Sequence, residues 1–214
     1  MVRWARVDAL DPDFTPHWLN RAQLARRDRL RQPNDRRHFI GVRLLLRNSV
    51  AESLGGSPSN VELHQHCDRC GGAHGHPTVS VADQPGPQVS MAHAGGVVVV
   101  AVASKPVGVD LEPIGRRTDD LTRWVRTEAV LKATGHGLDV DPLLVGISDS
   151  DAAPELTWWR GPGRRPTLRL ADIDLGDGFV AGVARLGRRR LDVDVAPRTV
   201  AVEPDERVSS EPVG

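Results

Sequence analysis

The 214-residue sequence has no net charge, few lysines and cysteines, and no long apolar run. Its 28 basic residues balance 28 acidic ones, which argues against a nonspecific nucleic-acid binder, because such proteins carry a strong positive field. No stretch is long enough to cross a bilayer, and residues 1–14 lack the apolar segment of a signal peptide. We therefore expect a cytoplasmic protein that binds neither nucleic acid nor membrane.

Lysine and cysteine each occur only twice. The other basic residues are arginines, so the choice of lysine at position 132 is noticeable beside Lys105. Because the chain has no net charge, any anion site must be a local cluster of basic residues. Cys67 and Cys70 are too close in sequence for a disulfide between them to link distant parts of the fold. In a reducing compartment such a pair suggests a metal or redox role before a structural disulfide.

The hydrophobic pattern predicts a mixed α+β protein. We expect helices over residues 17–30 and 35–55, the second capped by Asp35 and stopped by Gly55, with arginines on the solvent side of both. Two β-branched runs within residues 96–112 predict a hairpin of buried strands. A third helix is expected over 119–133 and three strands over 156–187, in which Trp158 and Trp159 are most simply core.

The order of these elements suggests two α+β halves. We place an N-terminal half at residues 1–104 and a C-terminal half at residues 105–191. The Pro, Glu and Ser content beyond them predicts a disordered tail over residues 192–214.

Two carboxylates stand at the end of an apolar run. In an extended strand Asp110 and Glu112 share one face, while Val109 and Leu111 point the other way. The two acids repel each other unless a positive group lies between them, and a hard cation such as Mg²⁺ fits. The alternative is an exposed strand end with two solvated acids.

A second charged pair lies on the expected third helix, where Lys132 follows Glu128 by one turn. On a wet surface this pair is worth about 0.3 kcal/mol and belongs on the polar side with Arg123 and Arg126. Glu128 falls instead at the centre of the apolar stripe, and burying a charge is costly unless the charge is paired or used. We therefore predict that Glu128 faces inward and is functional. The stripe consists of Leu121, Trp124, Val125 and Leu131.

The strand reads "GVDLE" from Gly108 and the helix reads "WVRTEAVLK" from Trp124. With "RRHFIGVRLLLR", "CGGAHGHP" and "VSMAHAGG" in the same order, the chain over residues 20 to 186 resembles the 4′-phosphopantetheinyl transferases of the larger, monomeric, surfactin-synthetase-activating type. The resemblance implies two similar α/β subdomains related by pseudo-twofold symmetry, with the ligand cleft between them. It also implies a Mg²⁺-dependent transfer of the phosphopantetheine arm of coenzyme A to a serine of an acyl- or peptidyl-carrier protein, releasing 3′,5′-ADP.

The resemblance also implies roles for individual residues. Asp110 and Glu112 would hold Mg²⁺, and Glu128 would be a third ligand or the base that accepts the serine proton. Lys132 would contact the phosphate being transferred. The residues expected to contact coenzyme A are Arg26, Arg37, His76 and His93, of which His93 would bind its 3′-phosphate.

Three features depart from the family pattern. The segment between strand and helix is short and lacks the family's third acid, which Asp119, Asp120 or a water molecule could replace. Ala92 and Ala94 replace the serines that flank the family histidine, and His76 stands where lysine is usual. A non-catalytic protein that binds coenzyme A or a carrier protein is therefore the alternative function.

The stretch "HQHCDRCGGAHGHP" offers a different interpretation. Its Cys-x-x-Cys pair with nearby histidines could bind structural Zn²⁺, which would make the chain a zinc-dependent interaction or nucleic-acid module. A redox pair, or a reduced loop near the adenine of coenzyme A, are the other interpretations. The candidate ligands are His64, His66, Cys67, Cys70, His74 and His76.

Overall fold

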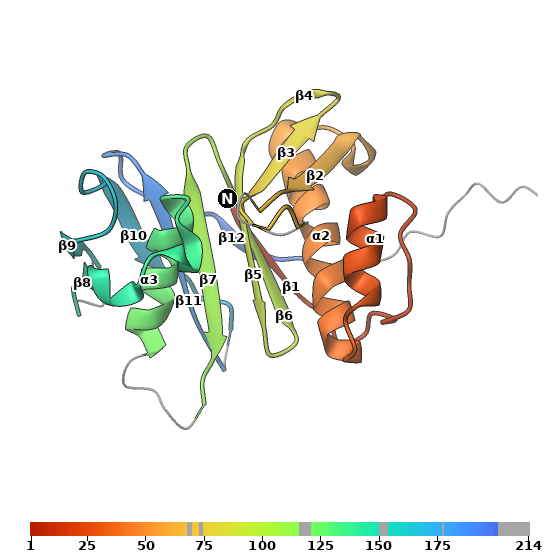
Figure 1. Ribbon diagram of the computed structural model, residues 1–214, viewed down its shortest axis with the longest axis horizontal. Helices are drawn as coiled ribbons and strands as arrows, with labels where there is room; N and C mark the ends of the chain where they lie inside the picture. The colour runs from red at the N-terminus through yellow and green to blue at the C-terminus, as the bar shows by residue number, and fades with distance from the viewer. Residues whose placement is uncertain (68–69, 73–74, 116–120, 150–153, 177, 201–214) are drawn as a thin grey trace, which may run out of the picture.

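The computed structural model describes residues 1–67, 70–72, 75–115, 121–149, 154–176 and 178–200. It is a mixed α+β protein in which helices cover several small sheets (Figure 1). Among these residues, no helix is long and apolar enough to cross a membrane.

The first sheet has the strand order β12-β1-β6-β5. Its strands are β1 (Val2–Arg6), β5 (Gln88–Ala94), β6 (Val97–Ala103) and β12 (Val195–Pro197). The helices α1 (Arg21–Asp28) and α2 (Pro33–Leu54) lie on one side of this sheet (Figure 1). Beside them lies a small sheet of β2 (Val61–Gln65), β3 (Pro77–Val81) and β4 (Gln84–Pro85), preceded by the short helix η1 (Pro58–Asn60).

The second main sheet has the order β10-β11-β7 and carries the predicted acidic strand. Its strands are β7 (Val107–Pro113), β10 (Leu168–Asp172) and β11 (Phe179–Leu186). The helix α3 (Leu121–Ala133) packs on its outer face (Figure 1). A two-stranded sheet of β8 (Val145–Ile147) and β9 (Leu156–Trp159) adjoins α3, with the short helices η2 (Gly137–Asp139) and η3 (Pro142–Leu144). The three strands expected over 156–187 are confirmed as β9, β10 and β11.

Strand β6 is apolar on both faces because both faces are covered. Val98 and Val100 pack against α2, whereas Val97 and Val99 pack against the second sheet. The predicted hairpin is therefore wrong: β6 pairs with β1 and β5, while β7 pairs with β11. The chain crosses from one sheet to the other at residues 104–106. Sequence alone could not distinguish the two arrangements, since both bury the same apolar runs.

The predicted disordered tail is wrong for residues 195–197. They form β12, which pairs in parallel with β1. Arg3 of β1 bonds both Glu52 of α2 and Asp194, with each ion pair at 2.7 Å. Arg198 also bonds Glu52, at 2.6 Å. These ion pairs hold residues 194–198 beside β1. Residues 201–214 lie outside the described part.

The two N-terminal helices differ in detail from the expectation. The first is shorter, and Asn20 caps it with a capping box that includes Gln23. The second begins at Pro33 rather than at an Asp35 cap, because proline suits a first helical turn, and Asp35 lies in that turn. The second ends at Gly55 as predicted, with a positive φ of 65°.

Several large side chains differ from the prediction in whether they are buried or exposed. Trp124 and Trp158 are 41% and 40% exposed and are not core residues. Arg126 is buried rather than on the polar side, because it pairs with Asp172 at 2.5 Å. Two α2 arginines are also buried: Arg43 lies against the Phe39 ring and Arg47 against the Trp18 ring.

Candidate functional site

The acidic strand and the charged helix meet at one ion pair. Lys132 of α3 donates from Nζ to Asp110 Oδ1 of β7 at 2.6 Å and to the Val109 carbonyl at 3.2 Å. Asp110 is only 7% exposed. On the opposite side of β7, Val109 and Leu111 join the core between the sheets, so the predicted alternation of faces is confirmed.

Gly108 explains how the helix comes close enough for this contact. A Cβ at this position would lie 2.0 Å from the Ala129 carbonyl oxygen and 2.5 Å from the Ala133 nitrogen. Both atoms belong to the α3 backbone, which cannot move as a flexible side chain could. The glycine of "GVDLE" therefore lets α3 rest directly on β7, which brings Lys132 over Asp110.

Glu128 lies on the buried side of α3, as predicted, with 6% of its surface exposed. Its Oε1 is a buried atom without a hydrogen-bond partner among the described residues. Burial raises the pKa of Glu128, and the charges of Asp110 and Glu112 act in the same direction, while Lys132 opposes them. The three carboxylates are thus close enough to act on one another.

Asp110 and Glu112 share this environment. Burial raises the pKa of Asp110, and the ion pair with Lys132 opposes the rise. Burial and the charge of Asp110 raise the pKa of the half-buried Glu112, which Lys132 and a hydrogen bond from the Trp124 side chain lower. One lysine therefore lies near three acids whose pKa values are all raised. A further cation would lower these pKa values by stabilising the carboxylates.

The donor chemistry of these residues fits a hard cation. Mg²⁺ takes one or two carboxylates and completes its shell with water and phosphate oxygens, and the unpartnered Glu128 Oε1 is an oxygen of the required kind. In the described part of the chain, no group of three or more His, Cys, Asp and Glu side chains is spaced to enclose a metal by itself. The proposed third acids, Asp119 and Asp120, lie outside the described residues.

His93 lies on β5 in the first sheet, and the charge of Lys132 acts on its ring. Its ring stacks on that of His38 of α2, with centroids 4.9 Å apart and planes at 24°. Although His93 keeps exposed surface, the withdrawal of its ring from water lowers its pKa to about 4. The neighbouring His38 ring, Lys132 and Arg43 are smaller causes of this lowering, and the charge of Asp35 opposes it. Residues of α2 and α3 thus act on the His93 imidazole of β5.

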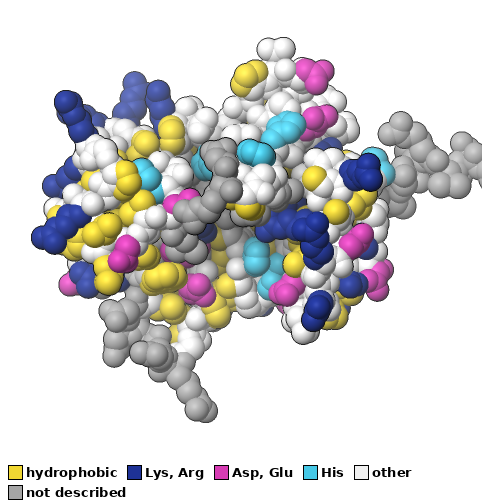
Figure 2. All heavy atoms as spheres, in the orientation of Figure 1, with side chains coloured by type: hydrophobic (Ala, Val, Ile, Leu, Met, Phe, Trp, Pro, Cys, Tyr) yellow, Lys and Arg dark blue, Asp and Glu magenta, His cyan; other side chains and the backbone are white. Residues whose placement is uncertain are grey.

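The two sheets are joined beside this site. The Val109 N–H of β7 donates to the Ser90 hydroxyl of β5 at 3.0 Å. Figure 2 shows Lys and Arg side chains gathered over α1 and α2 on the face in view, with histidine side chains beside them. The carboxylates therefore come from one sheet and its helix, and the adjacent basic groups from the other.

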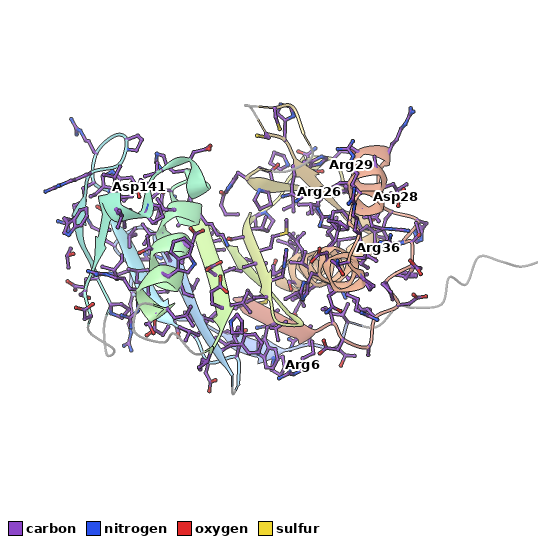
Figure 3. The ribbon with its side chains drawn as sticks, turned by 60° about the horizontal axis from the view of Figure 1, so that its bottom comes forward. Arg6, Arg26, Asp28, Arg29, Arg36 and Asp141 are labelled. Carbon is purple, nitrogen blue, oxygen red and sulfur yellow. The ribbon has the colours of Figure 1, made fainter. Side chains whose placement is uncertain are left out.

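The other predicted ligands of coenzyme A lie in the N-terminal half. Arg26 lies on α1 and extends over the Phe39 ring at 5.8 Å, in the part of the molecule shown at right in Figure 3. Burial lowers the pKa of Arg26. Arg37 donates to the Leu10 carbonyl and to the Asn34 side chain, both at 2.8 Å, which fixes its direction. His76 is exposed beside the start of β3.

Sequence reasoning missed Arg43 and His38. Arg43 is buried, stacks on Phe39 at 3.5 Å and donates to Gln65 at 2.8 Å, while its Nε has no partner among the described atoms. Both residues lie on the inner side of α2 within "RRHFIGVRLLLR". Their position among the apolar residues of that helix could have identified them. Charged and polar side chains are rarely buried at such positions unless they are paired or functional.

The described residues of the Cys/His stretch lie at the end of β2 and in the segment between β2 and β3. Cys67 is half-buried and Cys70 is exposed. The Gly71 N–H donates to the Cys67 carbonyl at 2.7 Å, and His64 bonds Ser80 at 2.8 Å. His74 lies outside the described residues. Zn²⁺ binding and a redox role of this stretch stay predictions.

No protein-family model matches the chain, and no curated protein matches its sequence. The function is therefore argued from the chemistry of the site.

Proposed function

We propose that this protein transfers the 4′-phosphopantetheine arm of coenzyme A to a serine of an acyl- or peptidyl-carrier protein and releases 3′,5′-ADP. One observation carries the proposal. Lys132 of α3 pairs with Asp110 of β7, and the charges of Asp110 and Glu112 act on Glu128 of α3. Among the described residues, Glu128 Oε1 is buried without a partner. The same four residues lie in two of the five motifs that carry the family resemblance.

Asp110, Glu112 and Glu128 are the residues that would hold Mg²⁺. When bound, the ion neutralises charge on the pyrophosphate of coenzyme A and on the carboxylates around it. A shell completed by water and substrate oxygens needs few protein ligands. Asp119 or Asp120 could supply a further carboxylate.

Glu128 is suited to accept the proton of the attacking serine. Its pKa is raised by burial and by two neighbouring acids, which makes its carboxylate a stronger base than an exposed glutamate. The serine oxygen bonds to the phosphorus next to the pantetheine arm, and the bond from that phosphorus to the departing 3′,5′-ADP oxygen breaks. The serine proton passes to Glu128, directly or through water.

Lys132 and the basic groups of the other sheet would bind the phosphates. Lys132 would contact the phosphate being transferred, where a cation stabilises the charge of the transition state. His93, with Arg26, Arg37 and His76, would contact coenzyme A in the N-terminal half. We place the ligand between two subdomains related by pseudo-twofold symmetry.

Calorimetry and a transfer assay together test the proposal. We expect coenzyme A to bind more tightly with Mg²⁺ than with EDTA, and an apo carrier protein to be modified under the same conditions. Asp110→Ala and Glu128→Gln should abolish transfer. Mg²⁺-dependent binding without modification of any carrier protein in a broad panel would favour the non-catalytic alternative. A fully active Asp110→Ala variant would overturn the metal assignment.

A further inference from the structure

His38 connects α2 to the strand turn beside His93. Its Nε2 accepts a hydrogen bond from the Gly96 N–H at 3.1 Å, and its ring stacks on His93 with centroids 4.9 Å apart. The side chain is 9% exposed. A single buried imidazole therefore contacts both the turn and the ring that precedes it.

The turn itself is held firmly. Gly95 and Gly96 join β5 to β6 with φ angles of 53° and 78°, the left-handed geometry that favours glycine in two-residue hairpins. The Val7 N–H donates to the Gly96 carbonyl at 2.9 Å. A Cβ on Gly96 would lie 2.4 Å from Asp8 Oδ1. His38 thus bonds a turn whose conformation is already fixed.

The hydrogen bond also determines the tautomer of His38. Because Nε2 accepts from an N–H group, the ring proton lies on Nδ1 and the ring is neutral. Burial lowers the pKa of His38, although Asp35 and Asp8 act in the opposite direction. A neutral ring can stack on His93 without charge repulsion. Lys132 and Arg43 are the cations that act on His93, and Asp35 is the opposing acid.

We propose that His38 is a positioning residue that, through its Gly96 hydrogen bond and its ring stack, holds His93 in the orientation that binds a phosphate of coenzyme A. This proposal rests on the proposed function for the identity of the ligand. It assigns His38 no contact with the substrate. The cations around His93 favour an anion there, and a fixed ring loses less conformational entropy when it binds one.

A double-mutant cycle measures whether His38 acts on coenzyme A binding through His93. His93→Ala should raise the KM for coenzyme A about tenfold or more, as expected for loss of a hydrogen bond to a charged group, with a smaller change in kcat. His38→Gln keeps an acceptor near Nε2 but removes the stacked ring, and His38→Phe keeps a ring but removes the acceptor. Each should raise KM severalfold. The double variant His38→Gln/His93→Ala should be no worse than His93→Ala, because His38 acts through His93.

The control is His17→Gln, which changes an exposed histidine before α1 and should leave KM unchanged. Circular dichroism and thermal unfolding of each variant identify a loss of folding. If the effects of His38→Gln and His93→Ala on KM are additive in well-folded proteins, the positioning role is overturned.

NMR titration of the His93 ring provides a readout that does not need activity. In the wild-type protein we expect His93 to titrate well below 6.5, and in His38→Gln to titrate closer to that ordinary value, because the covering ring is gone. An unchanged His93 titration would contradict the proposal. If the wild-type protein transfers nothing, the proposed function fails, and this titration alone decides whether His38 positions His93.

Discussion

Lys132 Nζ lies 2.6 Å from Asp110 Oδ1, and this contact joins the helix motif to the strand motif. The two residues are 22 positions apart in sequence and lie on different elements. The chain has two lysines, Lys105 and Lys132, and Lys132 is the one in the charged site. It is therefore a direct point at which to test the site.

Substitution of Lys132 by methionine should abolish function and reduce stability. Methionine keeps much of the packing but leaves the buried Asp110 without its cation, which should lower the free energy of unfolding by about 1–3 kcal/mol. Transfer should fall by about a hundredfold or more. Lys105→Met is the matched control, because Lys105 is exposed. Urea unfolding and initial rates measure the two effects, and equal behaviour of the two variants would contradict the role of Lys132.

Substitution of Gly108 by alanine should separate α3 from β7. The added Cβ would overlap the Ala129 carbonyl, so we expect about 1–3 kcal/mol of destabilisation and a loss of transfer as Lys132 moves from Asp110. At Gly56 a Cβ would meet no atom of the described residues within 4 Å, which makes Gly56→Ala the control. Thermal unfolding that is unaffected by Gly108→Ala would show that the helix does not rest on the strand as described.

Glu128→Gln should make the protein more stable at neutral pH while abolishing transfer. Burial raises the folded-state pKa of Glu128 above its ordinary value of 4.5, so ionisation opposes folding. Below pH 4.5 Glu128 is protonated in both the folded and the unfolded protein, and the full free energy of unfolding is present. As the pH rises through the raised pKa, Glu128 must ionise in the folded protein, and part of that free energy is lost. Glutamine cannot ionise, so its advantage over wild type should be present at pH 7 and vanish at pH 4.

Stability curves from pH 4 to pH 8 measure this difference, with Mg²⁺ absent. The exposed Glu155→Gln serves as the control and should follow wild type. A Glu128→Gln variant that is less stable than wild type at pH 7 would show that the Glu128 carboxylate is already satisfied in the folded protein.

Glu52 should show the opposite dependence on pH. Hydrogen bonds from Arg3 and Arg198 lower the pKa of Glu52 to about 2, so its contribution is present above its ordinary pKa of 4.5 and is lost as the pH falls toward 2. Because Glu52 is 38% exposed, solvent screening limits the loss in Glu52→Gln to about 1 kcal/mol at pH 7. Glu62→Gln, at an exposed position on β2, is the control. A difference from wild type that persists unchanged at pH 3 would argue against the ion pairs with Arg3 and Arg198.

Local sequence patterns predicted much of this site. Alternation along residues 109–112 placed Asp110 and Glu112 opposite the core residues Val109 and Leu111, and helical periodicity placed Glu128 on the buried side. Both inferences depend only on the geometry of one element. For the same reason the αL stop at Gly55 could be predicted.

Features that depend on long-range pairing could not be predicted. The apolar run of β6 is satisfied equally by a hairpin with β7 and by the observed neighbours β1 and β5. The parallel pairing of β12 with β1 joins residues almost the whole chain apart, and its ion pairs with Arg3 involve side chains that resemble ordinary surface charges. The His38–His93 stack likewise depends on how α2 packs against β5.

The most direct test of the proposed function is the intact mass of an apo carrier protein after incubation with this protein, coenzyme A and Mg²⁺. We predict that the carrier gains the mass of one phosphopantetheine arm, on a serine, and that Glu128→Gln produces no gain while Glu155→Gln matches wild type. No gain with the folded wild-type protein across a broad panel of acyl- and peptidyl-carrier proteins would contradict the account.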